Sequence, residues 1–157
     1  MEKHEKILFR FHSDIFDEEM VETLLAIELN KEKGLYKIDN IPFFLNLVAS
    51  DDIIRAEFDE KEQQLIYKET VEFGENSLIQ VVIMDKNIDT NTMRTEFSDL
   101  GCQSEKFKEG YFSMEVPSDL NFERIKKKLD ELSAAGKIDY AEPIIADRHS
   151  EQIKSAD

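Results

Sequence analysis

Alternation of apolar and polar positions marks the first half of the chain. From residue 21 to 29, a mostly apolar set recurs at every second position and alternates with polar or small positions such as Glu22, Ala26 and Glu28; the set is Val21, Thr23, Leu25, Ile27 and Leu29. A period of two is the signal of a half-buried strand. Met20, Leu24 and Ile27 also fit one face of a helix, so residues 18–29 leave strand and helix both open.

Further strand-like runs follow, separated by turns. The strands predicted in this half are residues 6–12, 21–29, 35–38, 53–58 and 65–73. Asn30 to Gly34 and Asp59 to Glu62 provide turns that would fold four of these runs into two hairpins. Pro42 has no N–H to donate and marks an edge or a corner. Several short strands with tight turns predict a small, partly open, barrel-like β unit.

The second half alternates strand-like runs with two amphipathic segments. Asp89 or Thr90 can cap a helix that carries Met93, Phe97 and Leu100 on one face. Gly101 is expected to close this helix in the C′ position, where a positive φ is common.

The second amphipathic segment begins after Pro117. Ser118 or Asp119 is the expected cap, and Gly136 the expected end. Its apolar stripe consists of Phe122, Ile125, Leu129 and Leu132. The predicted strands of this half are residues 78–84, 102–107, 111–116 and 137–141, the last one stopped by Pro143. The order β-α-β-β-α-β predicts a ferredoxin-like unit.

The overall expectation is therefore an α+β protein made of two units. Residues 1–77 would form the barrel-like unit, residues 78–146 the ferredoxin-like unit, and residues 147–157 a disordered polar tail. The two halves also differ in charge. Residues 1–77 hold 19 acidic and 9 basic side chains, and residues 78–157 hold 16 and 11.

Charge narrows the classes of partner. The formal net charge is −15, from 35 acidic and 20 basic residues. Nucleic acids and anionic membrane surfaces would be repelled, because both are bound largely through basic side chains. A basic protein would be attracted and steered. Solubility alone is the other explanation of the acidity.

Residues with catalytic or metal-binding potential are sparse. The three histidines, His4, His12 and His149, share no metal-ligand spacing with a carboxylate, so we expect no metal. Cys102 lacks a neighbouring base and is predicted to be a small buried hydrophobe. No phosphate-binding glycine loop occurs, so neither a cofactor nor catalytic residues are predicted. No apolar stretch is long enough to span a bilayer, and a cytoplasmic location is expected.

Clusters of acidic residues are the remaining feature. Two of these clusters lie on the hairpin predicted between the strands 53–58 and 65–73 and on the segment that leads into it. The hairpin would present their carboxylates close together to a cationic partner. The candidate partner-binding residues are Asp51, Asp52, Glu57, Asp59, Glu60 and Glu62.

Several segments resemble a bacterial protein family catalogued as domain of unknown function 4265. They are Val21-Glu-Thr-Leu-Leu-Ala26, Tyr36-Lys-Ile-Asp-Asn-Ile-Pro-Phe-Phe44, Asp52-Ile-Ile-Arg-Ala56, Leu100-Gly-Cys-Gln103 and Val116-Pro117. The resemblance would cover about residues 5 to 145, and Leu25 lies where a tryptophan is expected in the family. It implies a bacterial cytoplasmic protein without assigned catalytic residues.

Together these observations favour a non-enzymatic, acidic protein of the immunity type, which binds and neutralises a basic toxin or effector. The immunity role is an analogy with other small acidic bacterial proteins. The alternative is a small-molecule-sensing or regulatory module that uses the ferredoxin-like half as its ligand surface.

Overall fold

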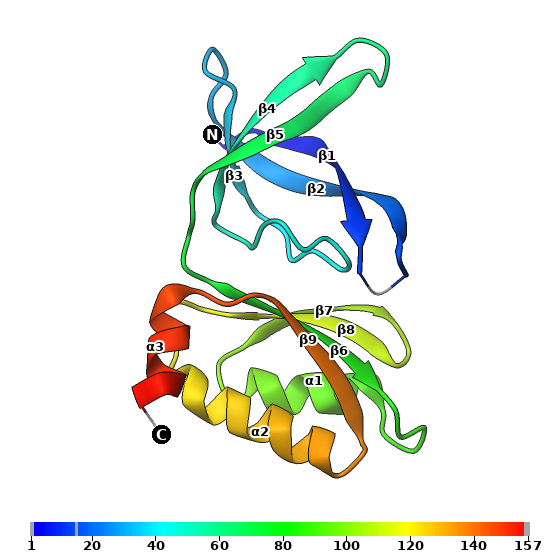
Figure 1. The fold of residues 1–157 in the computed structure, drawn as a ribbon. Helices are drawn as coiled ribbons and strands as arrows, with labels where there is room; N and C mark the ends of the chain where they lie inside the picture. Colours follow the sequence, from blue (N-terminus) through cyan, green and yellow to red (C-terminus); the bar gives the residue numbers. More distant parts are fainter. Residues whose placement is uncertain (1, 15, 156–157) are drawn as a thin grey trace. The chain divides into compact units, whose positions relative to one another are not determined.

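The computed structural model describes residues 2–14 and 16–155, which form two β-sheets and three helices (Figure 1). All strand pairs but one are antiparallel, so the α+β class is confirmed. The chain divides into two compact units, residues 1–74 and 75–157. The division lies three residues before the boundary expected from the sequence.

The first unit contains five strands. They are β1 (His4–Ser13), β2 (Glu18–Asn30), β3 (Leu35–Ile38), β4 (Ile53–Asp59) and β5 (Gln64–Glu72). Neighbours in this order are hydrogen-bonded, and β1 also pairs with β5 in parallel, through Ile7–Leu65 and Leu8–Ile66. Both predicted hairpins are confirmed.

The alternation in residues 18–29 resolves in favour of a strand. β2 pairs with β1 without interruption from Glu18 to Ile27, so its backbone bonds go to a neighbouring strand. Leu24 and Ala26 point into the core together with Ile7 and Phe9 of β1. The inward face is the opposite of the one predicted, because the pairing with β1 turns Leu24 and Ala26 to the core. The alternating set expected to face inward lies outside or at the margin: Val21, Thr23, Leu25 and Leu29 are exposed and Ile27 is half-buried.

The long connection after β3 is tied to β2 by one carboxylate. Glu22 accepts the backbone N–H groups of Phe43 at 2.7 Å, Phe44 at 3.0 Å and Leu45 at 2.9 Å. Backbone groups in a loop without regular pairing need such partners when they leave solvent. The Asn-Ile-Pro-Phe-Phe run thus lies in a loop that a strand residue holds in place.

Gly34 is required at the β2–β3 turn. Its φ of +69° lies in the left-handed region, and a Cβ there would come within 2.6 Å of the Ala56 carbonyl oxygen. The N–H of Ala56 donates to the Gly34 carbonyl at 2.9 Å. Only glycine combines this conformation with so close an approach of two backbones.

The second unit contains four strands and three helices. They are β6 (Ser77–Ile83), α1 (Thr90–Ser98), β7 (Gln103–Lys108), β8 (Tyr111–Val116), α2 (Phe122–Ala134), β9 (Ile138–Ile144) and α3 (Asp147–Ser155). The predicted order β-α-β-β-α-β is therefore the observed one from β6 to β9. In the sheet the strands follow the order β7-β8-β6-β9, and α1 and α2 cover the same face (Figure 1).

The core of this unit joins that face of the sheet to the helices. Ile79 and Val81 of β6 alternate inward as expected for a central strand. They meet Met93 and Phe97 of α1, and the predicted apolar stripe of α2 includes buried Phe122, Ile125 and Leu129. The prediction that Cys102 is a small buried hydrophobe is confirmed, since it belongs to this core.

Several element ends differ from the predictions. Asn121, and neither Ser118 nor Asp119, caps α2, with its side chain accepting from the N–H of Glu123. The C-cap of α1 is Asp99, two residues before Gly101. β9 continues through Pro143, which is tolerated because β9 lies at the edge of the sheet.

The expected disordered tail is wrong for residues 147–155, which form α3. The reason is that His149, although it lies in a polar segment, is fully buried and hydrogen-bonded. Residues 156 and 157 lie outside the described residues.

Candidate functional site

Asp52 is not available to a partner. Its side chain is only 1% exposed and accepts two backbone N–H groups, from Ala49 at 3.0 Å and from Gly74 at 2.8 Å. Burial raises the pKa of Asp52, although both hydrogen bonds oppose that shift. The sequence prediction of a docking carboxylate is wrong here, because the side chain closes the turn before β4 and holds the segment that follows β5.

Two other predicted residues are paired within the sheet. Asp51 lies 3.7 Å from the Nζ of Lys37 and has a φ of +73°. Glu57 accepts from Arg55 at 2.7 Å and lies 3.9 Å from Lys68. Their charges are partly compensated by these bases, so each attracts a cationic partner less strongly than an unpaired carboxylate would.

The three turn carboxylates between β4 and β5 divide into different roles. Asp59 accepts the N–H groups of Lys61 at 2.8 Å and Glu62 at 3.1 Å, which fixes the turn. Glu62 is ion-paired with Arg10 of β1. The carboxylate of Glu60 makes no contact of this kind within the described residues and is exposed. The structure therefore brings Asp59, Glu60 and Glu62 together at the tip of the hairpin. Of these three carboxylates, the one without a hydrogen bond or ion pair to the described residues is that of Glu60.

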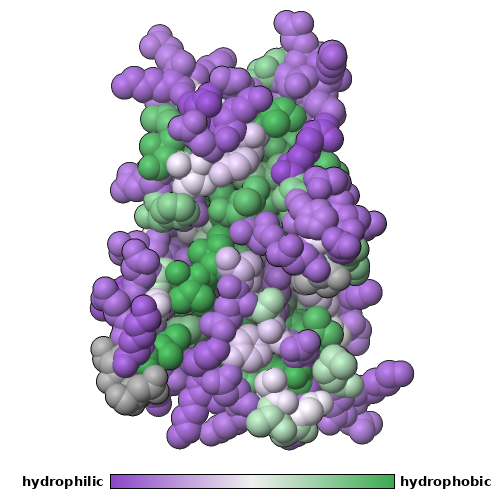
Figure 2. All heavy atoms as spheres, viewed as in Figure 1, coloured by the Kyte–Doolittle hydropathy of each residue, from purple (hydrophilic) through white to green (hydrophobic). Residues whose placement is uncertain are grey.

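An apolar side chain accompanies these carboxylates. Phe58, at the end of β4, is 59% exposed, although it follows the inward-facing positions Ile54 and Ala56. Polar residues cover most of the face visible in Figure 2, and apolar residues appear between them as separate patches. Phe58 could have been found in the sequence as a large apolar residue directly before an acidic turn.

Phe58 lines a hollow of about 330 Å³ between the β4–β5 hairpin and the β2–β3 turn. Tyr36 and Leu65 contribute further apolar surface. The charged side chains around it are three bases and two acids: Lys31, Lys33, Arg55, Glu32 and Glu57. The hollow is therefore not acidic itself, and an apolar side chain of a partner would fit it better than a cation.

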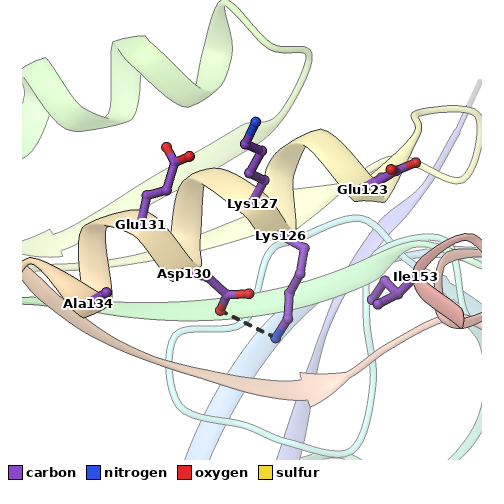
Figure 3. Close-up of a pocket in the computed structure, with 7 residues that line it drawn as sticks. All are labelled: Glu123, Lys126, Lys127, Asp130, Glu131, Ala134 and Ile153. Atoms are coloured by element: carbon purple, nitrogen blue, oxygen red, sulfur yellow. Dashed lines mark ion pairs between the residues drawn. The ribbon is translucent and has the colours of Figure 1, made fainter. Parts of the chain in front are cut away.

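A second hollow, of about 420 Å³, follows α2 beside Ile153 of α3 (Figure 3). Lys126 and Asp130 extend toward β9, whereas Lys127 and Glu131 extend to the other side of α2 (Figure 3). Lys126 donates to Glu142 at 2.5 Å.

Tyr140 of β9 completes this cluster. Lys126 donates to the Tyr140 hydroxyl at 2.7 Å, and that hydroxyl donates to Asp130. Burial works against the charged form, but the hydrogen bonds to Glu142 and Tyr140 raise the pKa of Lys126. Burial and then Asp130 raise the pKa of Tyr140, so this tyrosine is no general base near neutral pH. The cluster ties an edge strand to a helix.

A third hollow, of about 580 Å³, lies between α1 and β7. Its lining is almost entirely polar: Asn91, Arg94, Thr95, Ser98, Cys102, Gln103 and Ser104. Burial raises the pKa of the Cys102 thiol to about 12, so no thiolate nucleophile is present there near neutral pH. Sequence reasoning did not single out Arg94, which lies among amide and hydroxyl side chains on α1.

Sequence reasoning also missed a buried histidine–serine pair. His149 Nδ1 lies 2.6 Å from Ser77 Oγ, and its Nε2 lies 3.0 Å from the Pro117 carbonyl and 3.1 Å from that of Leu120. Carbonyls only accept, so Nε2 carries the proton and Nδ1 accepts from the serine. Ser77 also accepts the Ala146 N–H at 2.9 Å. With both side chains fully buried, the pair anchors α3.

Within residues 2–14 and 16–155, no group of three His, Cys, Asp or Glu side chains is placed to hold a metal ion. His12 contacts Asp17 and Glu19, both at 3.1 Å, and His4 contacts Asp39 at 2.9 Å, all as exposed pairs. None of the described helices is both long and apolar enough to cross a membrane.

Comparison with known proteins gives a fold and a family. A crystal structure of a hypothetical protein from Neisseria gonorrhoeae matches with a TM-score of 0.78 over 92% of this chain and 96% of that chain. The identity is 19%, so the match shows a shared fold alone. No curated protein matches the chain. The model of the family described as Domain of unknown function (DUF4265) matches residues 22–140, and the chain therefore belongs to this family.

Proposed function

We propose that this protein is a non-enzymatic binding protein of the immunity type, which engages a basic toxin or effector through the tip of the β4–β5 hairpin. The observation that supports it is Phe58, 59% exposed at the base of a turn with three carboxylates. Aromatic anchors surrounded by polar groups dominate the affinity of many protein interfaces. A bacterial, cytoplasmic setting belongs to the same proposal.

The contacts refine the six residues expected from the sequence. Asp52 drops out because it is buried, and Asp51 and Glu57 have cationic neighbours. The docking surface proposed here consists of Phe58, Asp59, Glu60 and Glu62. An apolar side chain of the partner would enter the hollow beside Phe58, and basic side chains around it would meet the carboxylates of the tip.

We also infer the finer description of the fold. The parallel pairing of β1 with β5 supports a barrel-like first unit. The sheet order β7-β8-β6-β9 with two helices on one face supports a ferredoxin-like second unit.

The test compares three forms of the tagged full chain in pull-downs from the native cell. In the double variant Phe58→Ala/Glu60→Lys, the anchor and the uncommitted carboxylate are changed, while the turn contacts of Asp59 remain. The matched control is Phe107→Ala/Glu105→Lys on β7, where an exposed Phe and Glu lie two positions apart. We expect a basic protein that the unaltered chain and the control capture and that the hairpin variant loses.

Two further measurements separate docking from the immunity role. Association should slow as salt rises, because attraction between exposed charges is screened beyond about 8–10 Å near physiological ionic strength. Expression of the captured partner alone should arrest growth, and co-expression of this protein should restore it. If the hairpin variant captured the partner as well as the unaltered chain, the hairpin would be excluded as the docking surface. A partner without toxicity would exclude the immunity role.

A further inference from the structure

Arg94 of α1 is held in place without any carboxylate. Its Nε donates to Ser104 Oγ at 2.9 Å and its Nη2 to the Ser104 carbonyl at 3.0 Å. Nη1 donates to Asn91 Oδ1 at 2.8 Å. No carboxylate of the described chain lies within ion-pair distance of this guanidinium, although the protein carries a net charge of −15. Glu96, on the same helix, pairs with Lys128 instead.

The guanidinium keeps donors to spare. It carries five N–H groups in a rigid plane, and three are used in these contacts. The remaining two have no acceptor among the described residues. Because three neutral partners fix the plane, little conformational freedom would be lost when a ligand binds to it.

The rest of the α1–β7 hollow also offers donors. Asn91 uses its Oδ1 toward Arg94, so its amide nitrogen is left without an acceptor in the described part of the chain. The hydroxyl of Ser98 and the side-chain amide of Gln103 likewise make no hydrogen bond to the residues described. One fixed cation among neutral donors selects an anion, since a cation would be repelled and an apolar group would leave the donors unpaired.

Lys126 of the α2 hollow differs from Arg94, because its charge is paired. There Lys126 is bound by Tyr140 and Glu142, and Tyr140 donates to Asp130, so this lysine already has anionic partners within the chain. In the α1–β7 hollow the charge of Arg94 has no ion-pair partner among residues 2–14 and 16–155.

We propose that the α1–β7 hollow is a binding site for a small oxyanion, the phosphate or carboxylate group of a metabolite, with Arg94 as its bidentate ligand. Planar guanidinium matches both groups through paired, charge-assisted hydrogen bonds. Asn91, Ser98 and Gln103 supply neutral donors around it. The site is separate from the β4–β5 hairpin, so either proposal can fail alone, and it would serve the ligand-binding module considered as the alternative from the sequence.

The test is a titration of the ¹⁵N-labelled full chain with inorganic phosphate and, separately, with malonate, at constant ionic strength kept with chloride. We expect saturable shifts of the Arg94 Nε–H and of the Gln103 and Ser104 amides. Tighter binding of phosphate would identify a phosphorylated ligand, and tighter binding of malonate a carboxylated one. Arg94→Gln should weaken binding by about tenfold or more, the scale of one charge-assisted contact.

Two variants make this result interpretable. Arg124→Gln removes the same charge from an exposed position of α2, and this variant should bind the two anions like the unaltered chain. Asn91→Asp keeps an oxygen for Arg94 and places a carboxylate in the first turn of α1, where negative charge is favourable. This variant should lose binding while its melting temperature stays the same or rises.

The proposal is overturned if neither anion gives saturable shifts at these residues. It is equally overturned if folded Asn91→Asp and Arg94→Gln bind as tightly as the unaltered chain.

Discussion

Asp52 in the first unit and His149 in the second are both titratable side chains withdrawn from solvent, and each fastens a segment to its sheet. Asp52 accepts two backbone N–H groups, and His149 bridges Ser77 to two carbonyls. Burial raises the pKa of Asp52 and lowers that of His149, because it disfavours the charged form of both. The same cause therefore makes the two units respond to pH in opposite ways, although their hydrogen bonds serve similar purposes.

The largest effect is expected from His149→Ala. This change leaves the Ser77 hydroxyl and two part-buried carbonyls short of a partner and opens a cavity beside Phe122, whose ring centroid lies 5.5 Å from that of the imidazole. The free energy of unfolding should fall by about 2–4 kcal/mol, measured by urea denaturation.

His12→Ala is the matched control, because His12 makes only exposed contacts and its loss should cost at most about 0.5 kcal/mol. Equal losses in the two variants would show that α3 is not held through His149.

Asp52→Ala should have the next largest effect. It leaves the buried N–H of Ala49 and the part-buried N–H of Gly74 without acceptors but also removes a desolvated charge, so we expect a net loss of about 1–3 kcal/mol. Asp52→Asn keeps one oxygen and should lose less. The adjacent Asp51→Asn should be close to neutral in the same urea experiment, and a larger loss there would contradict the assigned roles.

The pH dependence of folding stability tests the same two side chains without removing either of them from its packed position. Since the pKa of His149 is lowered, the unfolded chain binds more protons below about 6.5, and stability falls as pH drops from there toward the folded pKa. Since the pKa of Asp52 is raised, the unfolded chain loses its proton first, and this contribution falls as pH rises above about 3.8.

Urea denaturation of the unaltered chain, His149→Gln and Asp52→Asn between pH 4 and 7 checks both signs. His149→Gln should lose less stability than the unaltered chain when pH is lowered from 7 to 5. Asp52→Asn should gain more than the unaltered chain as pH rises from 4. Parallel curves for all three proteins would refute the assignment.

The smallest effect concerns Glu109, an exposed carboxylate with a task like that of Asp52. Its hydrogen bond to Lys106, followed by those from the N–H and hydroxyl of Thr90, lowers its pKa to about 2. Glu109 therefore stabilises the folded state above about pH 4.5, and this contribution disappears as pH falls toward 2.

Glu109→Gln should be slightly less stable than the unaltered chain at pH 7, because the contribution of an exposed carboxylate is small, and this difference should disappear as pH falls toward 2. The measurement is acid denaturation followed by circular dichroism. If Glu109→Gln and the unaltered chain lost structure along the same curve, the opposite pKa shifts of Glu109 and Asp52 would not reflect exposure against burial.

The sequence went far toward the fold because the fold depends on local periodicity. Apolar alternation located β2 as a strand but assigned its inward face to the wrong set of residues, and turn residues located both hairpins of the first unit. Helical spacing located Met93 and Phe97, whose burial follows from it. Exact ends were less predictable, because Asn121 and Asp119 are equally good caps until the chain geometry selects one.

The sequence by itself determined two units, the order of their elements as far as β9, a large negative charge and a buried thiol. Only the tertiary structure decided which carboxylates face solvent, since Asp52 and Glu60 look alike along the chain and differ only in what folds over them. It also decided that the polar segment around His149 is a docked helix and that Arg94 lacks a counter-charge. The physical reason is that periodicity is a property of neighbours in sequence, whereas burial and hydrogen bonding of single polar groups depend on residues far apart in the chain.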